Sequence, residues 1–466
     1  MTPADPTSAA TLPRVGAPPA KLPRRRLPRR LRNIELLLLL FAFGINAYAL
    51  MLVRFGLGLE LDTEMLQLAI LPTVIVLGLH VVLRISAPDA DPFMLPIVTL
   101  INGLGIAMIH RIDIARGDSG WDSFAVRQLA WAAIAAGVAI AAVLLLRNHR
   151  VLQRYNYLAM AAGVILLLLP LLPGIGVESF GAKLWVDLGV FTFQPGEFAK
   201  IALAVFFAGY LVTHRDSLSL TGKKFLGLQL PRARDLGPIL FVWAASIGVL
   251  VLQRDLGTAL LYFGLFVVML YLATGRSSWI LLGLGLFVAG AAIAVQFLPH
   301  VSARFRGWLA AFDPNVYEAV GGSYQLVQGL FGLANGGMLG TGFGRGRPTI
   351  TPLAESDYII ASLGEETGLA GLFAILVLYL LLISRGIRIG FAGQDDFTKL
   401  LASGLAFVIA LQCFIVIGGV TRIIPLTGLT TPLLAAGGSS LVANWLIVGL
   451  LLRLSDTVRN QPRLVV

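Results

Sequence analysis

From Asn33 onward, the chain consists mostly of apolar runs of about 18–25 residues separated by short polar segments. A run of this length, folded as a helix, crosses the roughly 30 Å hydrocarbon layer of a membrane. The runs lack the alternation of apolar and polar residues that a β-barrel requires. The sequence therefore predicts an all-α polytopic membrane protein with about twelve spans, near 33–55, 64–85, 92–110, 124–146, 151–173, 196–213, 236–253, 256–274, 278–297, 357–383, 400–420 and 431–452.

Composition excludes the main alternatives to a membrane protein. Hydrophobic residues make up 57% of the 466 residues and charged residues only 13%, whereas a soluble protein is about 25% charged. A water-soluble enzyme and a disordered chain are therefore excluded, and the single Cys413 excludes a disulfide scaffold. The formal net charge of +11 indicates membrane topology in such a chain, so we expect no nucleic-acid partner.

The basic residues predict how the chain is oriented. Residues 1–32 contain eight Lys and Arg and seven Pro, so we expect a disordered cytoplasmic tail that anchors topology or binds anionic membrane lipids. With this tail inside, the cytoplasmic segments hold about twice as many Lys and Arg as the rest of the chain. This bias predicts a multi-pass protein of the cytoplasmic membrane with both termini in the cytoplasm.

One long loop, residues 298–356, contains no apolar run long enough to span the membrane, and the predicted topology places it outside. Its aromatic residues, among them Trp308, Phe312 and Phe331, argue against disorder because they can bury apolar surface. Residues 324–334 have the pattern of an amphipathic or re-entrant helix. A loop this long in a compact protein is usually functional or disordered, so we expect it to be functional.

Ionisable residues near the ends of spans are candidate functional groups, because charge is costly at membrane depth. Glu197 and Lys200 lie three residues apart after Pro195 and share one helix face. Lys200 and Lys183 could neutralise a phosphate group, although the Glu197–Lys200 pair could also serve only the start of the helix. Asp255 falls at a helix start, where capping alone would explain a carboxylate.

The long loop carries the candidate catalytic acids. Asp313 and Glu318 are the loop carboxylates nearest its aromatic segment, and arginines such as Arg304 lie close in sequence. Carboxylates beside cations suit proton abstraction next to an anionic leaving group. The other interpretation is a solvated loop whose charges have no chemical role.

The span near 357–383 begins at Asp357 and contains Glu365 and Glu366. The helical rise places one or both glutamates inside the bilayer, where an acid needs a cationic partner. The nearest plausible cations are Arg422 and Lys200.

Several motifs of soluble enzymes and pumps do not occur. The sequence lacks a Walker A motif, which excludes an ATP-driven pump within this chain. The five His residues are scattered and have no metal-ligand spacing, so no metal site is predicted, although a divalent cation (Mg²⁺ or Mn²⁺) could bind at the acids. An outer face of acids and cations suits either an enzyme acting on a lipid-linked substrate or the mouth of a transporter.

The same polar stretches, in order over residues 92–455, resemble the SEDS family (shape, elongation, division, sporulation), whose best-known members are RodA and FtsW. They are Gly181-Ala-Lys-Leu-Trp185, Gln194-Pro-Gly-Glu-Phe-Ala-Lys200, Asp255-Leu-Gly-Thr258, Tyr324-Gln325, Gly342-Phe-Gly344, Asp357-Tyr-Ile-Ile-Ala361, Gly364-Glu-Glu-Thr-Gly368, Pro425-Leu-Thr-Gly428 and Gly437-Gly-Ser-Ser440. The resemblance implies a ten-helix core with one large external loop.

The resemblance also divides the chain into parts. The long N-terminus resembles the actinobacterial RodA-like subgroup. We expect a tail at 1–32, two extra N-terminal helices at 33–91, the core at 92–455 and a cytoplasmic C-terminal tail at 456–466.

The resemblance implies that the chain is a peptidoglycan glycosyltransferase that polymerises lipid II with inversion and expels undecaprenyl diphosphate, usually beside a class B penicillin-binding protein. The family's catalytic Asp lies six residues before the Tyr of the Tyr-Gln pair, which here falls on Glu318, with Asp313 as the alternative base. The candidate substrate-binding residues are Lys183, Trp185, Glu197, Lys200, Asp255, Tyr324, Gln325, Asp357, Glu366 and Arg422. A lipid II transporter and a non-catalytic scaffold for the penicillin-binding protein stay open as alternatives.

Overall fold

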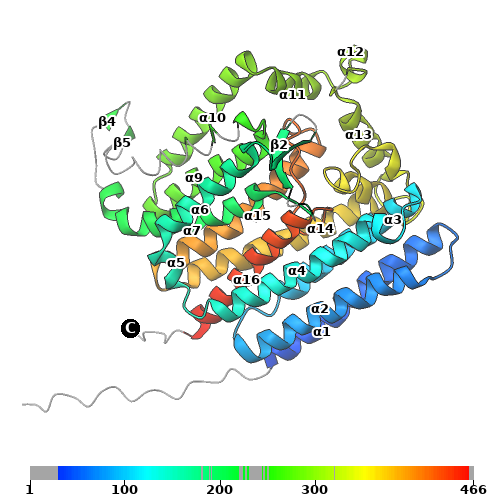
Figure 1. The fold of residues 1–466 in the computed structure, drawn as a ribbon, viewed down its shortest axis with the longest axis horizontal. Helices are drawn as coiled ribbons and strands as arrows, with labels where there is room; N and C mark the ends of the chain where they lie inside the picture. Colours follow the sequence, from blue (N-terminus) through cyan, green and yellow to red (C-terminus); the bar gives the residue numbers. More distant parts are fainter. Residues whose placement is uncertain are drawn as a thin grey trace, which may run out of the picture.

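The structure is a computed structural model that describes residues 30–460 except 180–181, 188, 190, 220–223, 226–227, 230–243, 245–246, 249–250 and 320. In this part of the chain, ten helices are long and apolar enough to cross a membrane. They are α1 (Arg30–Gly56), α2 (Thr63–Ser86), α3 (Met94–Arg116), α4 (Phe124–Leu145), α7 (Pro195–Ser219), α9 (Leu256–Thr274), α10 (Ser278–Phe297), α14 (Ile359–Ala392), α15 (Asp396–Val420) and α16 (Gly438–Asn460). The chain is a multi-pass membrane protein with a mostly helical fold (Figure 1).

These ten helices coincide with ten of the twelve predicted spans. The span predicted at 151–173 is broken into the shorter helices α5 (Arg150–Arg154) and α6 (Asn156–Leu168) and the turn η2 (Leu169–Leu171). The span predicted at 236–253 lies almost entirely outside the described residues, so the count of twelve stays a prediction. The last span begins at Gly438 rather than at residue 431, because residues 431–437 form a non-helical segment that contains Pro432 and Leu433, the latter with a φ of 66°.

Two helix ends differ from the predicted boundaries of the tails. Helix α1 already begins at Arg30, and residues 1–29 lie outside the described part. Helix α16 runs past residue 456 to Asn460, where Arg459 forms an ion pair of 2.8 Å with Asp91. The predicted division of the chain into parts stays a prediction.

Side-chain caps determine where several helices begin. The carboxylates of Asp62 and Asp395 accept hydrogen bonds from backbone N–H groups in the first turns of α2 and α15. The Ser123 hydroxyl does the same for α4, after the short turn η1 (Gly120–Asp122). A cap of this kind satisfies a backbone donor that has no partner within the helix.

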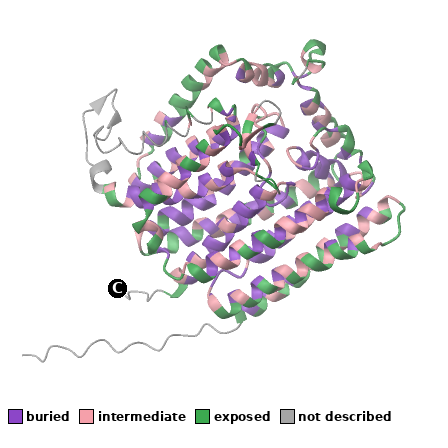
Figure 2. Ribbon diagram, in the orientation of Figure 1, coloured by how far each residue is buried: buried purple, intermediate pink, exposed green. Residues whose placement is uncertain are grey.

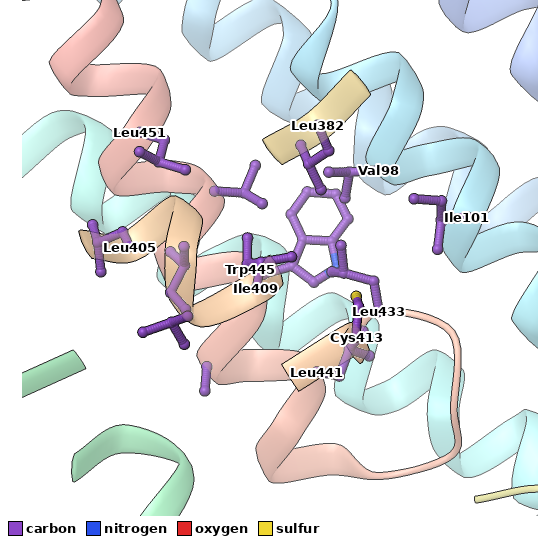
Figure 3. Packing of buried hydrophobic residues seen from close by; sticks show 14 of the residues in the cluster. Val98, Ile101, Leu382, Leu405, Ile409, Cys413, Leu433, Leu441, Trp445 and Leu451 are labelled. Carbon is purple, nitrogen blue, oxygen red and sulfur yellow. The ribbon is translucent and has the colours of Figure 1, made fainter. Parts of the chain in front are cut away.

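The centre of the molecule is formed by α3, α7, α15 and α16, whose apolar stretches are 72–78% buried. Helix α16 packs along α4, and α14 packs along α15 (Figures 1 and 2). Figure 3 shows the indole of Trp445 from α16 surrounded by Val98, Leu382 and Leu433, with the free thiol of Cys413 close by. In contrast, only 6% of the apolar stretch of α10 is buried, so this helix lies at the edge of the bundle.

Helices α1 and α2 lie side by side along one edge, against α3 and α4 (Figure 1). A buried chain of charges joins them near their shared end. The Glu35 carboxylate forms an ion pair of 2.7 Å with Arg32. Its other oxygen lies 2.6 Å from Nδ1 of His80 on α2. Arg32 also donates a hydrogen bond to the carbonyl oxygen of Ala90, which ties the pair to the rest of the bundle.

The long loop at 298–356 has regular structure in its described residues. It contains α11 (Pro299–Leu309), α12 (Pro314–Tyr317), α13 (Tyr324–Gly336) and the turn η3 (Pro348–Ile350). Helix α13 confirms the helix predicted at 324–334, whereas α11 was not predicted. A small apolar cluster of Ala311, Leu326 and Val327, with Tyr317 and Leu330 packed against it, joins the segment after α11 and the end of α12 to α13. We call the end of the bundle at which this loop lies, where α1 and α3 end and α7, α9 and α14 begin, the loop end.

Two small sheets were not predicted from the sequence. One consists of β1 (Gly176–Ser179), β2 (Ala182–Asp187) and β3 (Thr192–Phe193), antiparallel in that order. The other is the two-stranded pair β4 (Lys224–Phe225) and β5 (Leu228–Gln229). Strands of two to six residues are too short for their alternation to be recognised beside the long apolar runs.

Candidate functional site

A buried ion pair lies at the start of α7. The ammonium of Lys200, 1% exposed, is 2.5 Å from a carboxylate oxygen of Glu197, which confirms that the two residues share a helix face. Lys200 also donates a hydrogen bond of 2.8 Å to the side-chain oxygen of Gln412 on α15. The Gln412 amide donates in turn to the carbonyl oxygen of Thr430 at 3.0 Å. Lys200 therefore already has two partners and reaches a phosphate only if these contacts rearrange.

Asp255 caps α9, as expected, because its carboxylate accepts a hydrogen bond of 3.0 Å from the backbone N–H of Thr258. Burial raises the pKa of Asp255, while the Thr258 hydrogen bonds and the charge of Arg304 lower it and the nearby Glu197 raises it further. Asp255 therefore belongs to the same polar region as the Glu197–Lys200 pair.

Arg304 on α11 faces two acids at once. It lowers the pKa of both Asp255 and Asp357, and it donates a hydrogen bond of 2.8 Å to the carbonyl oxygen of Thr427. Burial nevertheless raises the pKa of Asp357 to about 6, and Glu355 adds to that effect. We call Glu197, Lys200, Asp255, Arg304 and Asp357 the core polar cluster.

Further hydrogen bonds join the elements around the core polar cluster. The Tyr262 hydroxyl on α9 donates to the carbonyl oxygen of Gly196 on α7 at 2.7 Å. The hydroxyl of Ser439 at the start of α16 accepts from the backbone N–H of Gln194 at 3.0 Å. Motifs that are far apart in the sequence thus meet at the loop end.

The acids within α14 have a different partner from the one predicted. Glu366, 1% exposed, forms an ion pair of 3.0 Å with Arg111 on α3. The expectation that Arg422 or Lys200 would pair with it is wrong, because both of those cations are engaged elsewhere. The neighbouring Glu365 accepts a hydrogen bond of 3.0 Å from the side-chain amide of Asn335 on α13.

Arg422 holds the end of α11. Its guanidinium donates to the carbonyl oxygens of Trp308 at 2.9 Å and Leu309 at 3.0 Å and lies 5.3 Å from the centre of the Phe312 ring. The Trp308 indole donates back to the carbonyl oxygen of Arg422 at 3.0 Å. Trp308, Leu309 and Arg422, with Leu330 and Thr421, line an open hollow of about 450 Å³.

The two candidate bases lie at either end of α12, and both are exposed. The Asp313 carboxylate caps this short helix by accepting a hydrogen bond of 2.9 Å from the backbone N–H of Asn315. Among the described residues, the Glu318 carboxylate has neither a hydrogen bond nor an ion pair. Glu318 is therefore the freer of the two acids.

The aromatic and amide candidates lie close to Glu318 in the chain. The rings of Tyr317 and Tyr324 are 5.3 Å apart, and Tyr324 is 42% exposed. The Gln325 amide donates a hydrogen bond of 2.8 Å to the carbonyl oxygen of Pro352, which fastens the start of α13 to the segment before α14. Tyr324 thus presents a ring surface beside the loop acids, while Gln325 supports the loop.

The cation expected on the Gly181–Trp185 motif lies on the three-stranded sheet. Lys183 on β2 is exposed and pairs in register with Glu178 on β1, whereas Trp185 is partly buried. Within the described residues, the Lys183 ammonium has no ion-pair partner within 4 Å. The Lys183 ammonium can therefore bind a ligand without breaking an ion pair to any described residue.

Three functional candidates were missed or misplaced by the sequence analysis. Arg111 and Gln412 were not singled out, although a charged or amide side chain inside an apolar run is itself a signal. Arg304 was recognised only as one of several loop cations, because nothing in the sequence indicates that it faces Asp255 and Asp357. Among the described residues, no group of three or more His, Cys, Asp or Glu could hold a metal ion.

Comparison with known proteins agrees with the resemblance seen in the motifs. Residues 92–460 match the family of cell cycle proteins that comprises FtsW, RodA and SpoVE. The peptidoglycan glycosyltransferase RodA of Mycobacterium tuberculosis is 44% identical over 97% of this chain and 95% of its own length. Stage V sporulation protein E of Bacillus subtilis is 31% identical over 79% of this chain and 97% of its own length.

Solved structures match over most of the chain as well. A peptidoglycan synthase complex that coordinates polymerisation and crosslinking contains a chain with a TM-score of 0.61 and 25% identity, covering 79% of this chain and 98% of that one. The rod shape determining protein RodA of Thermus thermophilus matches with a TM-score of 0.55 and 26% identity, covering 80% and 98%. The chain therefore belongs to the FtsW, RodA and SpoVE family of cell cycle proteins.

Proposed function

We propose that this chain is a peptidoglycan glycosyltransferase that extends glycan strands from lipid II. The observation that carries the proposal is its 44% identity, over 97% of its length, to a peptidoglycan glycosyltransferase. The site at the loop end supports it, since an exposed carboxylate and an exposed lysine lie there with a cluster of buried charges. Glycosyl transfer from a lipid diphosphate requires a base for the acceptor and cations for the leaving group.

The loop end faces the outside of the cell in this proposal, and both termini lie in the cytoplasm. The bias of Lys and Arg toward the opposite side supports this orientation. The lipid-linked substrate then approaches from the outer leaflet, so that its diphosphate lies at headgroup depth beside the loop end.

Glu318 is the proposed general base. It takes the proton of the acceptor's 4-hydroxyl group, and the resulting oxygen attacks the anomeric carbon of the donor from the face opposite the diphosphate. The carbon–oxygen bond to the diphosphate breaks, undecaprenyl diphosphate leaves with that electron pair, and the configuration at the anomeric carbon inverts. The free carboxylate of Glu318 supports this choice over Asp313, whose carboxylate is held as the cap of α12.

The proposed cations differ in how directly they can contact the diphosphate of the substrate. Lys183 is exposed and can meet the diphosphate directly. Lys200 and Arg304 lie among buried and partly buried acids, so their positive charge stabilises the leaving group mainly through space. Arg422 acts indirectly in this scheme, because its guanidinium holds α11 and the hollow beside it.

The proposed partner is a class B penicillin-binding protein that crosslinks the strands this chain makes. The similarity to a chain from a complex that coordinates polymerisation and crosslinking supports this assignment. A divalent cation at the acids stays a proposal that polymerisation assays with and without Mg²⁺ or Mn²⁺ would test.

The test is polymerisation of labelled lipid II by the purified full-length chain with its penicillin-binding partner, read as strand length on a gel. We expect Glu318→Ala to reduce chain growth by about 10²–10⁴-fold, the usual contribution of a general base. Glu318→Asp should keep part of the activity, and the thermal midpoint should match that of the wild type in both variants because the side chain is exposed.

Asp313→Ala is the matched control from the same segment. It should reduce activity far less than Glu318→Ala, because its carboxylate caps a helix of one turn. Loss in Asp313→Ala with normal growth in Glu318→Ala would move the base to Asp313. Wild-type protein that forms no strands would favour lipid II transport or a scaffold role.

A further inference from the structure

The outer end of α1 touches the long loop backbone to backbone. Helix α1 ends at Gly56, and a methyl group on this residue would overlap the carbonyl oxygen of Phe343 and lie 3.1 Å from the Cα of Gly344. On the other side, a Cβ on Gly344 would lie 2.7 Å from the carbonyl oxygen of Val53. The distances of 3.1 Å and 2.7 Å are both shorter than ordinary contacts of a Cβ atom. Only a pair of glycines therefore permits the two backbones to approach this closely.

Residues 340–347, which we call the glycine-rich loop, carry glycine at every second position up to Gly346. Its other side is bound to the acids of α14. Gly344 donates its backbone N–H to Glu366 at 2.9 Å, and the carbonyl oxygen of Gly346 accepts from Arg111 at 2.8 Å. Arg347 donates its backbone N–H to Glu365 at 3.1 Å. The glycine-rich loop is thus held between α1 and α14.

The glycine-rich loop is continuous with the segments that carry the proposed chemistry. On its N-terminal side lies α13, whose Asn335 also binds Glu365 and whose first residue, Tyr324, follows Glu318 by six positions. On its C-terminal side, the chain runs through Glu355, which is 2.6 Å from Arg116 of α3, to Asp357. The glycine-rich loop is therefore linked through the chain both to the candidate base and to one acid of the core polar cluster, and we expect a shift of this loop to disturb their positions.

The turn between α1 and α2 is itself fixed. Arg54 forms an ion pair of 2.6 Å with Asp62, the cap of α2, and donates a hydrogen bond of 2.9 Å to the carbonyl oxygen of Glu60. Glu64, in the first turn of α2, lies 3.6 Å from His110 of α3. The helix pair therefore presents a rigid end to the glycine-rich loop.

We propose that the helix pair α1–α2 positions the long loop on the core, with Gly56 as the positioning residue that acts through the glycine-rich loop. The inference rests on the proposed function for its effect on catalysis. It assigns to the two N-terminal helices, which precede the segment that matches the family, a role in holding the catalytic loop in addition to crossing the membrane. Misplacement of reacting groups by about 1 Å can cost about 100-fold in rate, so a rigid support of this kind is of consequence.

The test compares Gly56→Ala with Gly44→Ala in the full-length protein. Both substitutions add one methyl group to α1, but a methyl group at Gly44 would meet nothing within 4 Å. Three quantities are measured: amide hydrogen exchange of the peptides covering 337–350, the rate of lipid II polymerisation at saturating and at limiting substrate, and the thermal midpoint. Exchange reports the position of the loop without any reference to activity.

We expect Gly56→Ala to speed exchange in residues 341–347 and to lower the maximal polymerisation rate by about 10-fold, with little change in KM. The thermal midpoint should also fall, because the methyl group overlaps backbone atoms that have to move apart. Gly44→Ala should match the wild type in exchange and in polymerisation rate, and its thermal midpoint should be equal or slightly higher, because alanine favours a helix interior over glycine. Gly344→Ala disturbs the same contact from the loop side, because its Cβ would lie 2.7 Å from the carbonyl oxygen of Val53, and it should reproduce the pattern.

Wild-type exchange in both Gly56→Ala and Gly344→Ala would overturn the inference. Faster exchange with an unchanged polymerisation rate would overturn the link from α1 to catalysis. A wild-type chain that forms no glycan strands would count against the proposed function alone, since exchange would still show whether α1 holds the loop.

Discussion

Two sets of carboxylates lie at the loop end of the molecule and differ in their surroundings. Glu197 and Asp255 of the core polar cluster are buried and have fixed partners, whereas Asp313 and Glu318 lie exposed at the ends of a one-turn helix. A buried charge is costly unless it is paired, so the geometry of the core polar cluster is over-determined. Placing the exposed acids costs little free energy, because their carboxylates stay in contact with water.

The difference suggests a division of labour in the site. The buried charges supply a fixed electrostatic environment at the cost of stability if one partner is lost. In the proposed mechanism, the exposed acid supplies proton transfer. Substitutions in the first set should therefore affect folding and activity together, and those in the second set should affect activity alone.

The largest effect on stability is expected from Lys200→Met. The substitution keeps the length of the side chain but leaves the Glu197 carboxylate, 5% exposed, without its cation at 2.5 Å. Removing one partner of a buried pair costs about 3–5 kcal/mol. The measurement is the free energy of unfolding, or the thermal midpoint, of the purified protein in detergent.

Lys399→Met is a matched control for Lys200→Met. Lys399 also pairs three residues away, with Asp396 at 3.3 Å, but both of those side chains are exposed. It should cost less than about 0.5 kcal/mol. The double variant Glu197→Gln/Lys200→Met should recover part of the loss. Equal losses at Lys200 and Lys399 would show that burial does not distinguish the two pairs.

The sequence predicted the helical architecture better than the site, and the reason lies in the range of the interactions. Apolar length and local spacing depend on neighbouring residues, which is why ten spans, the cap at Asp255 and the shared face of Glu197 and Lys200 could be predicted. The partner of Glu366 is Arg111, 255 residues earlier. The spacing of neighbouring residues in the sequence does not indicate a pairing between residues so far apart in the chain.

The same limit explains the other differences. Arg304 is one of four arginines in the long loop, and only the packing of α11 places it opposite Asp255 and Asp357. The strands β1–β3 are held by antiparallel pairing rather than by a hydrophobic period. Interactions set by the tertiary fold, rather than by sequence periodicity, determine this part of the site.

A smaller effect, visible only against pH, is expected from Asp357→Asn. Because burial raises the pKa of Asp357 to about 6, the folded state holds this proton more tightly than the unfolded state. The wild type should therefore lose stability as pH rises from about 4 through about 6, by about 2–3 kcal/mol in total. Asparagine stays neutral, so the variant should lose this dependence and be the more stable protein above pH 6.

Thermal midpoints of the wild type and of Asp357→Asn between pH 4.5 and pH 8 would measure this difference. Asp122→Asn, at an exposed position in η1, is the matched control and should follow the wild type at every pH. Parallel curves for Asp357→Asn and the wild type would show that Asp357 is not held in a less polar environment than the exposed acids.

The smallest effect is expected at the exposed cation. Lys183→Gln removes a charge that has no ion-pair partner among the described residues, so the thermal midpoint should not change. If Lys183 contacts the diphosphate of the substrate, KM for lipid II should rise by about 3–10-fold, as expected for the loss of one charge-assisted hydrogen bond at the surface. The rise should shrink at high salt, because an exposed charge is screened by ions. Lys183→Arg should restore KM. If KM in Lys183→Gln is unchanged at low salt, Lys183 does not contact the diphosphate, and only the buried cations are left to stabilise the leaving group.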